Sequence, residues 1–256
     1  MPTPGLIIGL AGAVLGTAIL SGILGMAGGM ILMGVFAWTL PVGAAMMLHG
    51  LTQAVSNGYR AILNRNDIQW GLLTGYAVGA AGALALFAAI SFVPDKKTVF
   101  LVLGAIPFAA LAIPKQFTLD ITKSGASPAC GFIVTSFHLT AGVSGPMLDV
   151  FYVKSPLTRH QVVASKAVTQ TLSHLLKLVY FGLIVGALAA DAANGEALSL
   201  PWYVFAMVIP LAMIGTTLGK KVLDKMSDHH FRRWSQAILL VIGAVFIIRG
   251  LALLAG

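Results

Sequence analysis

Hydrophobic residues fill almost the whole chain, and polar residues occur mainly as short breaks between apolar runs. A helix that crosses a bilayer needs about 20 consecutive, mostly apolar residues. The breaks leave apolar segments at about 6–40, 42–63, 69–92, 98–114, 128–153, 161–189, 201–222 and 234–254. This pattern predicts an all-α polytopic membrane protein with one helix, or one broken helix, in each segment.

Two of these segments are interrupted by glycine-rich sequence. The segment 6–40 is too long for one crossing and contains GMAGG at 25–29, and the segment 128–153 contains AGVSGP at 141–146. Non-helical backbone at membrane depth is tolerated only where protein buries it or where it lines a cavity. We therefore expect a broken helix in each segment, re-entrant in the membrane.

The broken segments are candidates for binding an anion. Ser144 can cap a helix and Pro146 suits its first turn, so a helix N-terminus with free N–H groups is expected there. Close approach of a ligand to the backbone is expected at the glycines of the first break. The alternative is that these small residues only pack helices together. The predicted substrate-binding residues of the breaks are Gly28, Gly29, Ser144 and Gly145.

An internal repeat relates the two halves of the chain. The breaks lie 116 residues apart, and at an offset of 117 the stretch TQAVSNGYR (52–60) matches TQTLSHLLK (169–177), with Thr, Gln and Ser identical and a cation at the end of each. Such self-similarity indicates a duplicated architecture. We predict one transmembrane domain over 1–256, made of repeat 1 (1–114) and repeat 2 (120–256), each a broken segment plus three transmembrane helices.

Basic residues in the loops distinguish two arrangements of these repeats, because cytoplasmic loops are rich in Lys and Arg. If the broken segments are re-entrant, the halves are inverted and ten loop cations lie on one side of the membrane and two on the other. If the broken segments cross fully, the halves are parallel and the loop cations divide nine against three. The counts favour inverted repeats, with both termini outside. The ten are Arg65, Lys115, Lys123, Lys154, Arg159, Lys220, Lys221, Lys225, Arg232 and Arg233, and the two are Lys96 and Lys97.

The repeated polar stretches recur at three- and four-residue spacing, so each forms one stripe along a helix. Ionisable groups at membrane depth are costly unless they face the bundle interior or water, and they indicate a functional site. The alternative is that they join helices through hydrogen bonds. The predicted substrate-binding residues are His49, Thr52, Gln53, Ser56, Asn57 and Arg60 in the first stripe and Lys166, Thr169, Gln170, Ser173, His174 and Lys177 in the second.

Inversion gives these stripes a common geometry. They run in opposite directions, so Arg60 lies at the depth of Lys166 and His49 at the depth of Lys177. A substrate would then meet a pair of basic residues on each side of a Thr/Gln/Ser cradle. An interior with an excess of cations predicts an anionic substrate.

Proton coupling is a further hypothesis for three residues of these segments. Asp149 is the only acidic residue within an apolar segment. We expect it to pair with Lys154 or Lys166, with a proton-coupling role as the alternative. His49 and His174 are also candidates for proton coupling, because histidine titrates near neutral pH.

Composition excludes several other classes of protein. With 58% hydrophobic and only 9% charged residues the chain is too apolar for a soluble domain. Its basic residues are scattered through short loops, so the net charge of +8 does not predict nucleic-acid binding. The single cysteine, Cys130, allows no intramolecular disulfide and no Cys-based metal site, and we expect no metal and no cofactor. The first residues lack Lys and Arg, so a cleaved signal peptide is not expected.

Three functional classes are compared on these grounds. Broken helices and interior cations suit a secondary transporter of anions or an anion channel. An intramembrane serine protease is a third alternative, because GVSG (142–145) matches a G-x-S-G motif with His160 or His174 as base. The repeat assigns Gly28 to the position of Ser144, which argues against a nucleophile. The expected partners are a small anion and the lipid bilayer, and a homo-oligomer stays open.

The stretches LSGILGMAGGMIL, LTAGVSGPML and LPVGAAMMLHGLTQAVSN, together with the repeat, resemble the sulfite exporter TauE/SafE family of membrane transporters over almost the whole chain. The resemblance implies transport of small sulfur-containing anions, such as sulfite or organosulfonates like sulfoacetate, across the bacterial inner membrane, often outward. The family pattern has a further glycine where this chain has Ala27, and Ser144 replaces the central glycine of the second copy.

Overall fold

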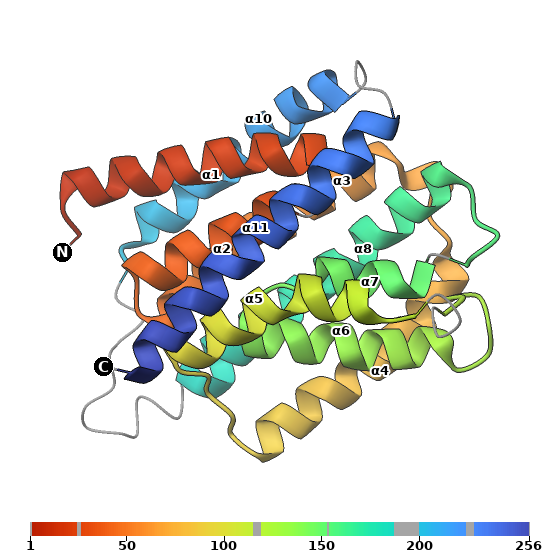
Figure 1. Cartoon of the computed structure of the whole chain (residues 1–256), viewed down its shortest axis with the longest axis horizontal. Helices are drawn as coiled ribbons and strands as arrows, with labels where there is room; N and C mark the ends of the chain where they lie inside the picture. The colour runs from red at the N-terminus through yellow and green to blue at the C-terminus, as the bar shows by residue number, and fades with distance from the viewer. Residues whose placement is uncertain are drawn as a thin grey trace.

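The computed structural model describes residues 2–24, 27–114, 119–152, 154–186, 200–223 and 228–255. Within these ranges the chain consists of helices joined by turns and short irregular connections (Figure 1). Among the described residues, five helices are long and apolar enough to cross a membrane: Pro4–Ile23, Trp70–Ala89, Arg159–Val185, Trp202–Val222 and Ala237–Ala255. The predicted all-α class is confirmed, and the helices fit a multi-pass membrane protein.

Within the described residues, each half contains five α-helices. The first half contains α1 (Pro4–Leu24), α2 (Ala27–Thr39), α3 (Val42–Leu63), the 3-10 turn η1 (Arg65–Asp67), α4 (Trp70–Ala89) and α5 (Lys96–Ala112). The second half contains α6 (Ala126–Ala141), α7 (Gly145–Tyr152), α8 (Arg159–Val179), the π-helical turn η3 (Tyr180–Val185), α10 (Trp202–Leu223) and α11 (Asp228–Ala255). Both ends of the chain lie at the same end of the bundle (Figure 1).

Local sequence explains where several helices begin and end. The carboxylate of Asp95 accepts a hydrogen bond from the backbone N–H of Thr98 at the start of α5. Hydrogen bonds from the side chain and the backbone of Thr98 lower the pKa of Asp95. Thr158 and Gln161 form a capping box at the start of α8. At the end of α6 Gly142 adopts φ +80°, a left-handed conformation that favours glycine.

The glycine-rich breaks interrupt helices as predicted. The first arms, α1 and α6, end at Leu24 and Ala141, 117 residues apart, and α2 and α7 follow after short gaps. With an offset of 117 residues, Ser144 corresponds to Ala27. The sequence comparison of the breaks used an offset of 116 and paired Ser144 with Gly28, one residue further along the chain. The arms are unequal, because α1 has 21 residues and α2 only 13. The start of the first break, 25–26, lies outside the described residues.

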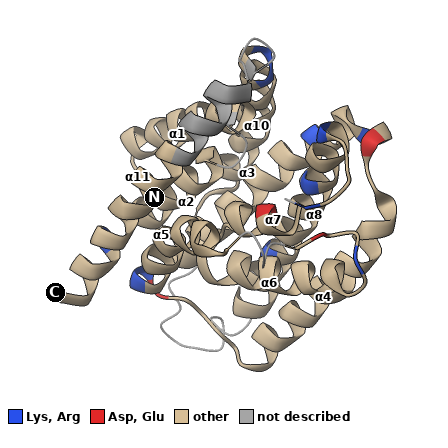
Figure 2. Cartoon of the chain, turned by 45° about the vertical axis from the view of Figure 1, so that its right-hand side comes forward, with Lys and Arg blue, Asp and Glu red and all other residues tan. Residues whose placement is uncertain are grey.

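Charged side chains are sparse over the middles of the helices. Figure 2 shows long uncharged stretches, with most Lys, Arg, Asp and Glu near helix ends and connections. Burying a charge in hydrocarbon is expensive, so this distribution is typical of membrane-spanning helices. Two exceptions among the described residues are Lys177, which is buried inside the bundle, and Arg249, which lies against Trp38 at the lateral surface.

The strongest helix packing joins the two halves. α1 packs on α10, α4 on α6, α5 on α11 and α3 on α8. Glycines allow backbones to touch at these crossings: Gly22 meets Gly219 between α1 and α10, and Gly104 meets Gly243 between α5 and α11. In lipid no hydrophobic force favours helix association, so close packing of small residues holds the helices together. The two halves therefore form one interlocked body.

We predict that Gly79→Ala lowers the stability of the protein by about 1–3 kcal/mol, the usual effect of overpacking. A Cβ at Gly79 would overlap the carbonyl oxygen of Pro128 on α6, whereas a Cβ at Gly82 on the same helix would lie 3.7 Å from the Phe132 ring. Gly82→Ala is thus the matched control and should stay within about 0.5 kcal/mol of the wild type. Thermal unfolding of the purified protein in detergent measures both, and equal stability of the two variants would contradict the α4–α6 contact.

Candidate functional site

A small polar cavity lies where the two broken helices meet α3 and α8. Its volume is about 20 Å³, room for about one water molecule. None of the described residues that line it is acidic. They are Gly29 from α2, His49, Gln53 and Asn57 from α3, His138 from α6, Val143 and Ser144 from the second break, Gly145 from α7, and Gln170 and His174 from α8.

Helical periodicity brings the polar side chains to this cavity. On α3 the lining residues follow each other at intervals of four, and Gln170 and His174 on α8 have the same spacing, so each set shares one face. A Cβ at Gly29 would lie 3.3 Å from the amide of Gln53, so this glycine lets the amide approach the start of α2. Eight of the predicted substrate-binding residues line the cavity: Gly29, His49, Gln53, Asn57, Ser144, Gly145, Gln170 and His174.

Lys177 lies directly behind the cavity and is fully buried. Its Nζ is 2.8 Å from Nδ1 of His49 and 3.1 Å from the carbonyl oxygen of Gly142. Nε2 of His49 is 2.9 Å from the carbonyl oxygen of Gly29, which can only accept, so the neutral ring donates through Nε2 and accepts from Lys177 at Nδ1. His49 and Lys177 thus lie together, as their predicted depths require, and they connect α8, α3, α2 and the end of α6.

A basic residue stands at the end of the first arm in both halves. Arg60 on α3 donates from Nη2 to the carbonyl oxygen of Ser21 in the last turn of α1, at 3.2 Å. Lys177, the repeat counterpart of Arg60, donates to the carbonyl of Gly142, the C-cap of α6. The negative end of a helix dipole favours such a cation. These two side chains therefore stabilise the broken helices, and neither lines the cavity.

Lys166 is not a free cation of the cradle. Its Nζ forms an ion pair with Oδ1 of Asp149 on α7, and the two side chains are 18% and 38% exposed. This is one of the two pairings expected for Asp149. Arg60 and Lys166, predicted to lie at the same depth and to meet the substrate, each bond to the protein in this structure and neither lines the cavity, so their role in binding stays a prediction.

Serines of the two stripes join helices instead of lining the cavity. Oγ of Ser56 on α3 lies 2.7 Å from Oγ1 of Thr216 on α10. Oγ of Ser173 on α8 lies 2.7 Å from the Tyr76 hydroxyl and 3.0 Å from Oγ1 of Thr135, which ties together α8, α4 and α6. These contacts match the alternative in which polar side chains hold the bundle together.

Three further predicted residues have packing or local roles. The hydroxyls of Thr52 and Thr169 donate to carbonyl oxygens one turn earlier in their own helices, at 2.7 and 3.0 Å. A Cβ at Gly28 would overlap the carbonyl oxygen of Thr17, so Gly28 allows α2 to pack against α1. None of the three lines the cavity.

Sequence reasoning missed two of the lining residues, Val143 and His138, and His138 is the polar one. Its Nε2 lies 3.4 Å from Nε2 of His174, and its Nδ1 lies 2.9 Å from the Val134 carbonyl oxygen and 2.8 Å from Oγ of Ser144. The search for stripes overlooked it, because the repeat counterpart of His138 is Ser21 and the polar pattern differs between the halves. A histidine inside an apolar segment was the available signal.

His174 contributes an open hydrogen-bonding position to the cavity. Its side chain is 3% exposed, and its Nδ1 has no hydrogen-bond partner among the described residues. Buried polar atoms nearly always have a partner, so an unpaired one in a cavity lining marks a place where a ligand can bind.

The ion pair between Asp149 and Lys166 predicts a specific stability pattern. Lys166→Met should destabilise the protein by about 1–2 kcal/mol, less than for a fully buried pair, because it leaves a carboxylate without its partner. The double variant Lys166→Met/Asp149→Leu should recover most of that loss. Thermal unfolding of both variants, with Asp149→Leu alone completing the cycle, measures the coupling. Additive effects would contradict the ion pair.

Comparison with known proteins places this architecture in a family. The family model described as "Sulfite exporter TauE/SafE" matches residues 8–246, nearly the whole chain, including both broken segments and every residue that lines the cavity. Neither the search of curated proteins nor the search of solved structures gave a match. The extent of the family match is sufficient: the chain belongs to the sulfite exporter TauE/SafE family of membrane transporters.

Proposed function

We propose that the chain is a secondary transporter that exports small sulfur-containing anions, sulfite or organosulfonates such as sulfoacetate, across the bacterial inner membrane. Family membership supports membrane transport of this class of substrate. The observation that carries the proposal is the polar, acid-free cavity beside the first residues of α2 and α7.

The chemistry of this cavity suits an anion. Gly29 and Gly145 belong to the first turns of their helices, where the dipole is positive and backbone N–H groups lack intrahelical partners. The side-chain amides of Gln53 and Gln170 supply further neutral donors, whereas Nδ2 of Asn57 already donates to the backbone carbonyl and the side-chain oxygen of Gln53. Lys177 adds positive charge from behind His49. An oxyanion would thus be held mainly by neutral donors, which release it more readily than direct ion pairs.

The two histidines on α6 and α8 provide an adjustable donor. If the Ser144 hydroxyl donates to Nδ1 of His138, Nε2 of His138 donates to Nε2 of His174, and Nδ1 of His174 becomes a donor for an anion. If Nδ1 of His138 donates to the Val134 carbonyl, the chain reverses and Nδ1 of His174 becomes an acceptor. We assign the first arrangement to the substrate-bound state, and a proton-coupling role for His174 fits the exchange between the two.

An inverted repeat fits the path of the chain. In Figure 1 α1 begins at the left and α2 returns toward the left, whereas α6 begins at the right and α7 returns toward the right. Each broken pair would then be re-entrant, with α3 to α5 crossing in the first half and α8, α10 and α11 in the second. This puts both termini outside and the cavity at the interface of the repeats, the usual place for a transporter site.

Two alternatives are less well supported. A channel needs a continuous pore, whereas the cavity has room for about one water molecule and must open to admit an oxyanion. A protease needs a nucleophile and a base within reach of substrate. Ser144 does contact a histidine, but it is His138 and not His160 or His174, and both partners are fully buried.

Counterflow in proteoliposomes tests the proposed function. Vesicles loaded with unlabelled sulfite should accumulate labelled sulfite transiently, because a transporter exchanges substrate through one alternating site while a channel shows no counterflow. Sulfoacetate, taurine, sulfate and acetate are the comparison substrates, and sulfite or sulfoacetate should compete best. Uptake without counterflow would indicate a channel, and equal competition by acetate would contradict selectivity for sulfur oxyanions.

A pair of histidine variants on one helix locates the site in this assay. We expect His174→Ala to reduce counterflow at least ten-fold, equivalent to about 1.4 kcal/mol, because the cavity loses its open donor. His160→Ala removes an exposed histidine from the same helix and should leave counterflow unchanged. Equal activity of the two variants would remove His174 from the proposed site.

Accessibility of single cysteines tests the topology. In a Cys130→Ala background, cysteines at Thr3 and Lys123, both exposed, should be labelled by an impermeant reagent from opposite sides of the membrane. Inverted repeats with re-entrant broken segments require this result. Labelling of both positions from the same side would instead support parallel repeats with eight crossings.

A further inference from the structure

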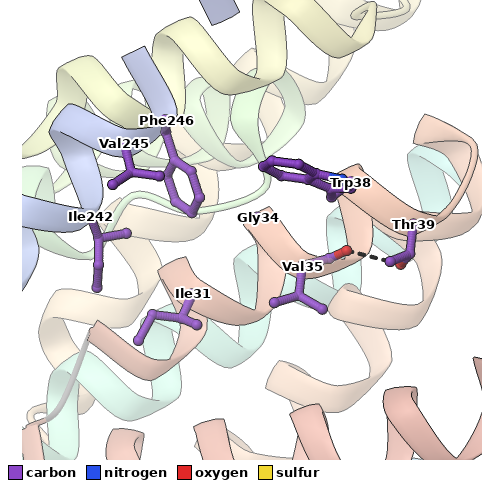
Figure 3. Close-up of a pocket in the computed structure, with 8 residues that line it drawn as sticks. All are labelled: Ile31, Gly34, Val35, Trp38, Thr39, Ile242, Val245 and Phe246. Carbon is purple, nitrogen blue, oxygen red and sulfur yellow. Dashed lines mark hydrogen bonds between the residues drawn. The ribbon is translucent and has the colours of Figure 1, made fainter. Parts of the chain in front are cut away.

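An apolar groove lies on the lateral surface of the protein between α2 and α11, apart from the central cavity (Figure 3). Its volume is about 270 Å³. Trp38 and Val245 at its edge are 54% and 50% exposed, so the groove opens to the surroundings of the bundle. The lining is apolar except for one threonine and consists of Ile31, Gly34, Val35, Trp38, Thr39, Ile242, Val245 and Phe246.

A cation lies at one end of this groove. Arg249 is the only charged residue in the span Ala237–Ala255 of α11. The Cζ atom of its guanidinium is 4.4 Å from the centroid of the Trp38 ring, and its Nε is buried without a hydrogen-bond partner among the described residues. A cation–π contact satisfies only part of such a group, and a charge in a membrane span requires a partner. The guanidinium therefore still has donors to offer an anion.

The positions of these residues along the helices match one leaflet of a bilayer. Arg249 is six residues, about 9 Å, from the end of α11, and Trp38 is one residue from the end of α2. Trp rings and the long side chain of Arg are typical of the membrane interface. From Ile31 to Thr39 the groove follows α2 for about 12 Å, compared with about 15 Å for half of the hydrocarbon core.

We propose that this groove binds one molecule of an anionic phospholipid, with its phosphate on Arg249 and one acyl chain along Ile31, Val35 and Val245. The groove has the polarity and length for the chain, and the open donors of the guanidinium complement the phosphate. A second copy of this protein would bring mainly apolar helix surface to Arg249 and would leave those donors unpaired. The site is separate from the transport cavity and does not depend on the proposed substrate.

Fluorescence quenching by brominated lipids measures lipid preference at the mouth of the groove. A variant that retains Trp38 alone, with Trp70, Trp202 and Trp234 replaced by Phe, is reconstituted into mixtures of phosphatidylcholine and phosphatidylglycerol in which one lipid carries brominated chains. Phosphatidylglycerol should be preferred at Trp38 by about five-fold, the usual effect of one basic residue near an anionic headgroup. A second variant that retains Trp202 alone reports lipid on α10, outside the groove, and should show nearly equal affinity for the two lipids.

Substitutions separate the headgroup contact from the chain contact. Arg249→Gln should reduce the preference at Trp38 to nearly one, whereas Arg249→Lys should retain most of it. Native mass spectrometry of the full chain should show that Val245→Trp, which fills the groove, loses bound phosphatidylglycerol at least five-fold. Val241→Trp, an exposed position on the same helix outside the lining, should retain it.

Three results would overturn the proposal. One is equal quenching of Trp38 by both lipids in the protein with Arg249. Another is a preference for phosphatidylglycerol that persists in Arg249→Gln. The third is that Val245→Trp keeps its lipid and changes only the oligomeric mass, which would assign the groove to a second copy. Thermal unfolding of each variant in detergent reports correct folding independently of transport.

Discussion

A polar group at membrane depth is costly unless the protein, water or a ligand gives it a partner, because hydrocarbon offers none. The ammonium group of Lys177 shows how the structure meets this constraint. It donates to His49 on α3 and to the carbonyl of Gly142 at the end of α6, and His49 in turn contacts the carbonyl of Gly29 on α2. One buried cation thereby connects four helical elements around the cavity and satisfies a carbonyl that breaking α6 leaves exposed. The broken helices and the buried cation depend on each other.

Packing between the halves provides the frame that holds this network in place. α1 packs on α10 and α4 packs on α6, so helices of the first half lie directly against helices of the second half. Backbones approach closely at glycines in these contacts, which gives dense packing without any hydrophobic driving force between helices. The short arm α7 has only eight residues, and its ion pair from Asp149 to Lys166 on α8 helps to anchor it. Movement of the arms relative to this frame is the simplest way to open a cavity that now holds about one water molecule.

Charged side chains inside the bundle and on its lateral surface differ in the partners that they have. Inside, the charges are compensated by carbonyls, by a histidine or by a carboxylate, and the cavity lining itself presents neutral donors. On the lateral surface, the guanidinium of Arg249 lies over the ring of Trp38, and its Nε has no hydrogen-bond partner among the described residues. The cost of a charge within the membrane explains both faces. Interior cations are compensated by protein groups, whereas the donors that Arg249 leaves unpaired are available to a ligand from the membrane.

The sequence by itself determined the helical class, the positions of both glycine-rich breaks and the two polar stripes, because hydropathy, helix-breaking residues and periodicity are local properties of the chain. The two-repeat organisation stays a prediction. The sequence also paired His49 with Lys177 in depth through the repeat. Only the tertiary structure decided which polar residues meet. Helix rotation turned Ser56 and Ser173 toward neighbouring helices, and the relative placement of α7 and α8 brought Asp149 within ion-pair distance of Lys166. His138 entered the cavity without any counterpart in the other half, because α6 and α8 bring it against His174 from 36 positions away. Such contacts depend on the relative placement of helices, which no local pattern specifies.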